Sequence, residues 1–209
     1  MTRGWAALLA GCALAGCGHG DAPPAAASAK SVALSWQAIV TDADRDRLRR
    51  WRDAWMAALP LAKRTGAAVI AADPSLFDPD RALSDAMPPP GDYHCRMFKL
   101  GANGVPAKDF IWYPTQACRV TDEGEAYSLR LLDGAQRPAG LLLRDTDARA
   151  IFLGTLVLGD ETTPLQYGRD ATRDMAGYVE RVGPGKWRLV LPWPHFESLL
   201  DVVELTPAG

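Results

Sequence analysis

This sequence of 209 residues has no long apolar run, no large excess of one charge and few cysteines. No apolar run approaches the ~20 residues that a helix needs to cross a bilayer and remain there. The chain carries 23 Lys and Arg against 25 Asp and Glu, so it lacks the basic excess of a dedicated nucleic-acid binder. Its four cysteines are too few for a disulfide-dense mini-protein, and 48% apolar residues are too many for a disordered chain.

Recognisable catalytic and cofactor motifs are also missing. No serine of the globular part lies in the Gly-x-Ser-x-Gly setting of a nucleophile elbow, and Gly183 to Lys186 lacks the remaining residues of a phosphate-binding loop. Asp42 to Asp53 imitates a calcium loop, yet Arg47 stands where glycine must make the turn. The globular part holds only two histidines, whereas a catalytic zinc needs three protein ligands. We therefore expect no cofactor and no metal site.

The first residues have the features of an export signal followed by a lipid-attachment site. Arg3 supplies a positive charge, and Trp5 to Ala15 is an uncharged apolar stretch of the length of a signal-peptide core. Leu14 to Cys17 (Leu-Ala-Gly-Cys) resembles a bacterial lipobox, so we predict a signal peptide over residues 1–16 and a lipid on Cys17. Two alternatives remain open. A similar tetrad ends at Cys12 but leaves a shorter apolar core, and a plain secretory signal would be cleaved elsewhere.

Residues 17–31 combine Cys17 with a stretch rich in Ala, Pro, Gly and Ser, a composition that cannot pack a core. We interpret this stretch as a flexible tether. The expected location is the bacterial cell envelope, where the lipid anchors the chain to a membrane and the domain faces the periplasm. Gly18 follows the cysteine in place of an aspartate, which favours the outer membrane over the inner one.

Helical periodicity opens the globular domain, which we place at residues 32–209. A helix is expected from Thr41 or Asp42, and its apolar residues recur at three- and four-residue spacing: Leu48, Trp51, Trp55, Ala58 and Leu59. Pro60 must kink or end this helix because it removes a backbone hydrogen bond, and residues 62–72 can continue it. Residues 73–90 form a turn-rich connection with room for one short helix near 81–86. The helical and loop part therefore covers residues 32–90.

A hairpin with a disulfide is expected next. Residues 92–100 and 110–120 have the pattern of strands and are separated by a turn-rich stretch. If the hairpin folds symmetrically about Pro106 and Ala107, Cys95 lies directly opposite Cys118, within reach of a disulfide bond. Beyond the inner membrane such a pair is more often a disulfide than two thiols.

Short apolar runs separated by turn signals fill the rest of the chain. They cover residues 126–132, 140–144, 150–158, 175–182, 186–191 and 200–205. With the hairpin this makes about eight strands, and loops this short leave no room for helical crossovers, so the sheet should be antiparallel. We predict an α+β fold in which the N-terminal helix or helices pack on an antiparallel β-barrel over residues 91–209, with a sandwich as the alternative.

Several segments resemble a known bacterial family. They are Trp51 to Trp55, Pro90 to Gly101, the pair Cys118-Arg119 and Arg169 to Leu205, and the most specific is the Gly-Asp-Tyr-His-Cys-Arg stretch that begins at Gly91. They are similar to domain-of-unknown-function family 4893, found among alphaproteobacterial secreted and lipoprotein sequences, over most of residues 32–207. The resemblance implies no particular activity. Small periplasmic lipocalin-like and protease-inhibitor barrels share the expected architecture, but a shared fold does not imply a shared function.

Aromatic and arginine side chains near the predicted strand ends suggest a binding surface, because these residue types anchor many recognition surfaces. The candidates are Trp112, Tyr113, Arg96, Arg119, Trp187 and Trp193, although each tryptophan could instead fill the core. The first hypothesis is a lipid-anchored envelope protein that acts as a binding or interaction module and not as an enzyme. Its partner would be an envelope protein or a small ligand, and no nucleic acid.

Two other functions remain open. A periplasmic hydrolase of unrecognised type would use His94 as a base oriented by Asp92 or Glu197, and His195 is the other histidine available to it. This hydrolase requires the polar groups to converge in a cleft. A barrel-type inhibitor of exported proteases would present a loop or an N-terminal segment as an exposed, rigid projection.

Overall fold

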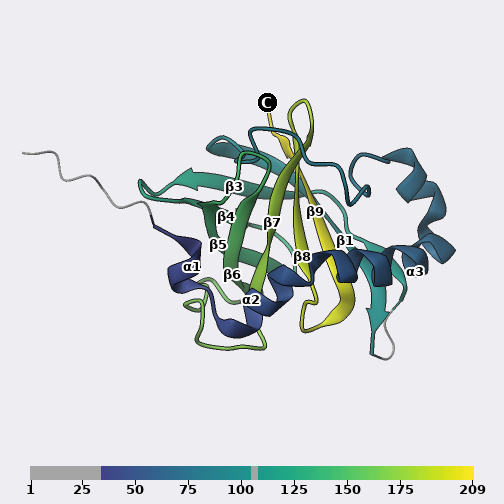
Figure 1. The fold of residues 1–209 in the computed structure, drawn as a ribbon, viewed down its shortest axis with the longest axis horizontal. Coiled ribbons are helices and arrows are strands. Elements are labelled where there is room, and N and C mark those ends of the chain that lie inside the picture. Colours follow the sequence, from purple (N-terminus) through teal and green to yellow (C-terminus); the bar gives the residue numbers. More distant parts are fainter. Residues whose placement is uncertain (1–33, 105–107) are drawn as a thin grey trace, which may run out of the picture. The chain divides into compact units, whose positions relative to one another are not determined.

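The structure, a computed structural model, describes residues 34–104 and 108–209. The predicted signal peptide (1–16), the lipid site at Cys17 and the tether (17–31) lie outside the described residues. In the described part, helices come first and antiparallel strands follow (Figure 1). The helices lie within residues 36–72 and the strands within residues 91–207.

Eight strands close into an antiparallel barrel. The described residues form nine strands, of which all but β2 belong to the closed barrel: β1 (Gly91–Asn103), β2 (Phe110–Trp112), β3 (Gln116–Asp122), β4 (Tyr127–Leu131), β5 (Gln136–Arg144), β6 (Ala150–Leu158), β7 (Asp174–Gly183), β8 (Lys186–Pro192) and β9 (Glu197–Pro207). β1 pairs with β3 on one side and with β9 on the other, which closes the barrel, while β2 is an extra strand paired with the second half of β1. The predicted α+β barrel is confirmed, and closure excludes the sandwich.

The predicted strand 110–120 is wrong in one respect, because the chain bends within it. β2 ends at Trp112 and β3 begins at Gln116. Pro114 lies in the bend, and proline has no N–H to donate to a strand ladder. The bend separates the two partners of β1, so β2 continues along the barrel end while β3 enters the wall.

The predicted helix is divided into two at Arg50, after a short first helix. The helices are α1 (Trp36–Ile39), α2 (Asp42–Arg49) and α3 (Trp51–Ala72). Thr41 caps α2 as expected, because its side chain accepts a hydrogen bond from the Asp44 N–H at 3.2 Å. α3 continues through Pro60, so this proline does not end the helix. Pro60 lies on the exposed face, where the carbonyl group four residues earlier can face water.

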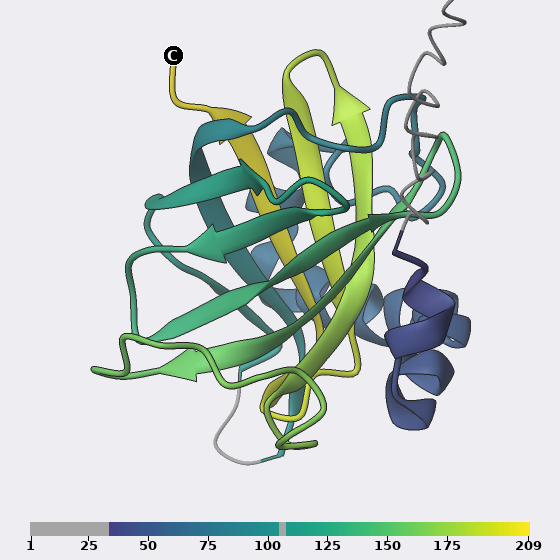
Figure 2. The same cartoon turned by 90° about the vertical axis from the view of Figure 1, so that its left-hand side faces the viewer.

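The helices pack against the outside of the barrel wall rather than over one end (Figure 2). α2 contacts β7, and α3 crosses β1, β8 and β9. Figure 2 shows the strands as a closed wall with the helices along one side of it. The strands under α3 are therefore buried on both faces over much of their length.

Apolar side chains fill the barrel interior, as in other small barrels. Leu129, Phe152, Leu189 and Val203 belong to this inner cluster. A second cluster, between α3 and the wall, is built around the fully buried Trp55. Because side chains occupy the interior, open space for a ligand has to be sought at the ends or on the outside of the barrel.

The predicted disulfide is present, but the predicted register is shifted by two residues. Cys95 and Cys118 are bonded, with their Cα atoms 5.9 Å apart. Across β1 and β3, however, Tyr93 faces Cys118 and Cys95 faces Gln116, so the bond runs diagonally. The symmetric hairpin was the wrong assumption because the bend between β2 and β3 changes the pairing along β1.

The connection between α3 and β1 contains no helix, so the short helix predicted near residues 81–86 is wrong. Leu83 instead forms an isolated antiparallel bridge with Arg181 of β7. Its N–H donates to the Arg181 carbonyl at 2.8 Å. The connection thus lies against the barrel wall, where the buried Arg188 donates hydrogen bonds to its main-chain carbonyls.

Candidate functional site

A cavity of about 810 Å³ opens at the end of the barrel where β1 ends and β9 begins, the lower end in Figure 1. We call it the mouth cavity. It is lined by Asn103, Gly104, Lys108, Phe110, Ile111, Trp112, Gln136, Leu158, His195, Phe196 and Glu197. These residues come from five strands, from the β8–β9 loop and from the two sides of the β1–β2 connection. Apolar surface with a few polar groups is the usual composition of a small-ligand pocket.

β2 forms one wall of the mouth cavity and is held against α3. Phe110 stacks near Phe98, with ring centroids 6.2 Å apart, and it packs into the cluster beneath the helix. Gly66 of α3 has no side chain, and any Cβ there would collide with the Phe110 ring. Trp112, two residues further along, is 53% exposed at the cavity. One strand therefore joins the core to an exposed aromatic surface.

The β8–β9 loop and Glu197, the first residue of β9, form a second wall, and the backbone is strained at two positions. Trp193 has φ of 51° and Glu197 has φ of 68°, values that residues other than glycine rarely adopt. The Ser198 N–H donates to the Phe196 carbonyl at 2.8 Å, which closes a tight three-residue turn around Glu197. Strained backbone conformations persist only where the surrounding structure enforces them, and they are most frequent at functional sites.

A buried ionic cluster lies behind Glu197. Lys99 of β1 and Asp201 of β9 face each other across the strands and are almost fully buried, with Nζ and Oδ2 3.1 Å apart. Ser198 donates its hydroxyl hydrogen to the other Asp201 oxygen. Lys99 Nζ also lies 3.5 Å from Oε2 of Glu197, which accepts a hydrogen bond from Gln136 at 3.3 Å. The cluster therefore fixes the position of the half-exposed Glu197 carboxylate.

Burial and charge act in opposite directions on this cluster. Burial alone would lower the pKa of Lys99, but the Asp201 and Glu197 carboxylates outweigh it, so the pKa of the Lys99 ammonium lies above its ordinary value. Burial raises the pKa of Asp201, and Lys99 opposes that increase. Burial also raises the pKa of the nearby Tyr113 hydroxyl. Lys99 thus remains charged at neutral pH and supplies a permanent positive charge behind the cavity wall.

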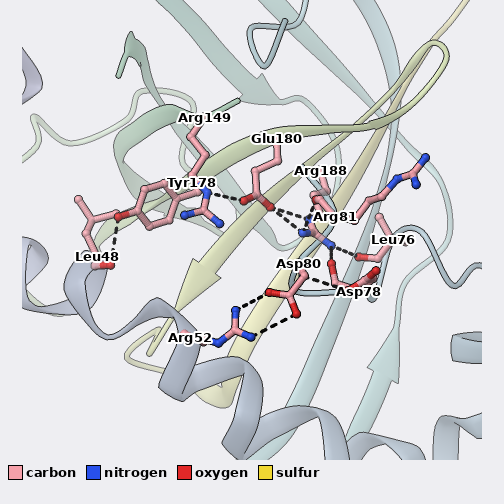
Figure 3. Close-up of polar contacts among 10 residues, drawn as sticks. All are labelled: Leu48, Arg52, Leu76, Asp78, Asp80, Arg81, Arg149, Tyr178, Glu180 and Arg188. Carbon is pink, nitrogen blue, oxygen red and sulfur yellow. Dashed lines mark hydrogen bonds and ion pairs between the residues drawn. The ribbon is translucent and has the colours of Figure 1, made fainter. Parts of the chain in front are cut away.

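A second polar cluster lies outside the barrel, beneath the α3–β1 connection (Figure 3). Arg188 of β8 is fully buried, and its guanidinium forms an ion pair with Glu180 of β7 at 2.7 Å. Its other N–H groups donate to the main-chain carbonyls of Leu76, Asp78 and Arg81 at 2.7 to 2.9 Å. Figure 3 shows the connection curving around this guanidinium. The guanidinium donates four hydrogen bonds to four acceptor atoms, and Nη2 also lies 2.7 Å from the Glu180 Oε2 atom that accepts from Nε.

The same cluster continues toward the surface through Arg149. This side chain donates to Glu180 at 2.7 Å and lies over the Trp51 ring, 4.1 Å from its centroid. At the exposed edge Arg52 pairs with Asp80 of the connection. The cluster joins α3, the connection, β7 and β8, and its buried members are already paired with one another. We therefore assign it a structural role.

The six residues predicted as a binding surface do not converge on one face. Trp112 lines the mouth cavity, and the partly buried Tyr113 packs against the barrel interior. Trp187 is 7% exposed and packs edge-to-face with Tyr93 inside the barrel, so it belongs to the core. Trp193 lies in the β8–β9 loop, where its indole N–H donates to the Arg50 carbonyl at 3.2 Å.

The two predicted arginines lie on the outer wall and are paired with carboxylates. Arg96 is 3.0 Å from Glu204, and its guanidinium lies over the Phe98 ring. Arg119 is exposed and pairs with Asp92 at 2.6 Å. Of the six predicted residues, only Trp112 lines the mouth cavity.

The two histidines lie at opposite ends of β9. His94 pairs with Thr206, whereas Glu197 pairs with Asn103 and His195 precedes it in the loop. At about 3.3 Å per residue, these ends are separated by about 30 Å. Asp92, the other predicted orienting group, is engaged with Arg119. A base formed by His94 and Glu197 is therefore excluded by the register.

Sequence reasoning missed Lys99, Asp201, Gln136 and Phe196. Alternation along β1 places Tyr93, Cys95 and Met97 on the inner face, and Lys99 is the next residue in this phase. A charged residue on an otherwise apolar inner face was the available signal for Lys99. Gln136 had no such signal, because the sequence prediction began its strand at residue 140.

Residues 34–104 and 108–209 contain no group of three or more His, Cys, Asp or Glu side chains placed to hold a metal ion. Among the helices of this part of the chain, none is long and apolar enough to cross a membrane.

The comparisons with known proteins identify a family. No curated protein and no solved structure gives a significant match to this chain. A family model described as "Domain of unknown function (DUF4893)" matches residues 36–205, which covers nearly all of the helices and the barrel. This match agrees with the resemblance seen in the sequence, and the chain therefore belongs to the DUF4893 family.

Proposed function

We propose that this protein is a small-ligand-binding module attached to the bacterial envelope by a lipid on Cys17. The observation that carries the binding role is the mouth cavity, whose volume of about 810 Å³ lies within the range of small-molecule sites. Its exposed tryptophan, its half-exposed carboxylate and its strained loop are features of binding sites rather than of a sealed barrel end. A concave site of this size favours a small ligand over a protein partner.

The lipid anchor rests on the Leu-Ala-Gly-Cys tetrad that ends at Cys17. Mass spectrometry of the mature protein from a bacterial envelope should find Cys17 as the first residue, with the mass of a diacylglycerol group added. Cys17→Ser should leave the protein unlipidated and release it from the membrane fraction. An unmodified N-terminus at another residue would contradict the anchor and leave the proposed binding role intact.

Trp112 is expected to carry a large part of the ligand affinity, because an exposed aromatic side chain at a cavity supplies contact area with little loss of side-chain freedom. A metabolite library screened by thermal shift should yield compounds that stabilise the protein. Trp112→Ala should raise their Kd about tenfold, which corresponds to about 1.4 kcal/mol.

Met56→Ala is the matched control for this experiment. Met56 is also an exposed apolar residue, at 61%, but it lies on α3 away from the mouth cavity. This variant should leave the Kd values unchanged. Compounds that bind equally well to both variants would place the binding site elsewhere and contradict the proposed function.

A further inference from the structure

The mouth cavity presents one group of each charge to a ligand. Among its lining residues Glu197 carries a carboxylate and Lys108 an ammonium, and His195 is the remaining titratable side chain. The other lining residues are apolar or uncharged. The lining residues therefore offer a ligand one carboxylate and one ammonium group.

The Glu197 carboxylate has an oxygen left for a ligand. Its Oε2 atom faces Lys99 and accepts the Gln136 hydrogen bond, whereas Oε1 accepts no hydrogen bond from the described residues. The side chain is 44% exposed, so a ligand group can approach it. The Lys99 charge does not cancel that of Glu197, because Lys99 is paired mainly with the buried Asp201. Its Nζ atom lies 3.1 Å from Asp201 and 3.5 Å from Glu197.

The surroundings of Glu197 suit an ammonium group. A carboxylate held by the buried Lys99 ammonium and by Gln136 is preorganised and loses little side-chain freedom on binding. The half-exposed Trp112 lines the same cavity, and aromatic rings attract cations. Lys108 supplies the complementary positive charge for a carboxylate.

We infer that the mouth cavity takes a zwitterionic ligand, an amino acid or a short peptide, with its ammonium on Glu197 and its carboxylate on Lys108. The inference rests on the proposed function and adds the chemical class of the ligand. The cavity volume of about 810 Å³ leaves room for an apolar side chain against Phe196 and Trp112. Free amino and carboxyl termini are then the recognised groups.

The test uses isothermal titration calorimetry with the tripeptide Ala-Phe-Ala in four forms: free, N-acetylated, C-amidated and capped at both ends. The free form should bind most tightly, and removal of either charge should raise the Kd at least about tenfold. Because the charge is removed from the peptide, this comparison needs no protein variant and does not depend on a variant folding.

Two variants assign each terminus to its residue. Glu197→Gln should raise the Kd of the free peptide about tenfold. The Kd of the N-acetylated peptide should stay nearly unchanged, because that peptide has no ammonium group for Glu197 to bind. Lys108→Gln should likewise raise the Kd of the free peptide and leave the Kd of the C-amidated peptide nearly unchanged, because that peptide has no carboxylate for Lys108 to bind. Asp53→Asn and Lys63→Gln remove exposed charges on α3, outside the cavity, and should change neither Kd.

The outcomes separate the two claims. Equal binding of the free and the doubly capped peptide would overturn the zwitterion inference and leave the proposed function standing. If none of the four peptides binds but other compounds bind in a Trp112-dependent manner, the zwitterion inference is overturned and the proposed function stands. If no compound binds in a Trp112-dependent manner, both claims fail.

Discussion

Replacement of Arg188 by alanine is expected to lower the free energy of unfolding by about 3–5 kcal/mol, the largest effect of any single substitution considered for this protein. The guanidinium is fully buried and is the shared partner of Glu180 and of three main-chain carbonyls in the α3–β1 connection. Its removal leaves a buried carboxylate with Arg149 as its remaining partner, and it leaves carbonyl oxygens without donors. Urea unfolding followed by tryptophan fluorescence measures the change.

Arg119→Ala is the matched control for Arg188→Ala. Arg119 also forms an ion pair, with Asp92, but both side chains are more than half exposed. Exposed pairs contribute about 0–1 kcal/mol, so this variant should be nearly as stable as the parent. Arg188→Lys keeps the charge but not the planar set of five donors, and it should fall between the two. Equal stability of Arg188→Ala and Arg119→Ala would show that the connection does not depend on Arg188.

Loss of the Cys95–Cys118 disulfide is expected to cost about 3 kcal/mol, because the bond closes a loop with a sequence separation of 23. For a domain of this size, that corresponds to a decrease in Tm of about 6–12 °C. Both sulfur-bearing residues are fully buried, so a reductant should act only after the protein opens. The measurement is thermal unfolding of the Cys95→Ala/Cys118→Ala variant beside the parent protein.

A reductant supplies the control for the disulfide prediction. Parent protein that has been unfolded, reduced and refolded should match the double variant in Tm, within the small cost of replacing two buried sulfurs by methyl groups. Reductant should leave the Tm of the double variant unchanged. If the Tm of the double variant lies within about 1 °C of the Tm of the oxidised parent, the disulfide does not contribute to the stability of the barrel.

Local signals in the sequence determined most of the fold. The sequence places the start of the helix at Thr41 or Asp42, and the structure shows Thr41 as the cap, accepting from the Asp44 N–H. The strands after Cys118 were located by glycine and aspartate turns. The register of the first hairpin was not accessible, because the bend at Pro114 divides the partners of β1 between two strands.

The mouth cavity could be predicted only in part, because its residues are far apart in the sequence. Trp112 was a candidate, but Gln136 and Glu197 reach it only through pairing of β5 with β6 and closure of β1 on β9. No local pattern specifies that closure. Trp187 shows the opposite case, since it alternates with Leu189 and Leu191 on the inner face and is therefore a core residue.

The central claim is that the mouth cavity binds a small ligand, and chemical-shift mapping tests it most directly. The measurement is a ¹H–¹⁵N spectrum of the full chain, titrated with the tightest compound from the screen. The account predicts shift changes that cluster at Gln136, Leu158 and Glu197, three residues from separate strands that meet at this cavity. Changes confined to the groove of about 660 Å³ outside β5 and β6, which Leu141 and Leu153 line, would contradict it.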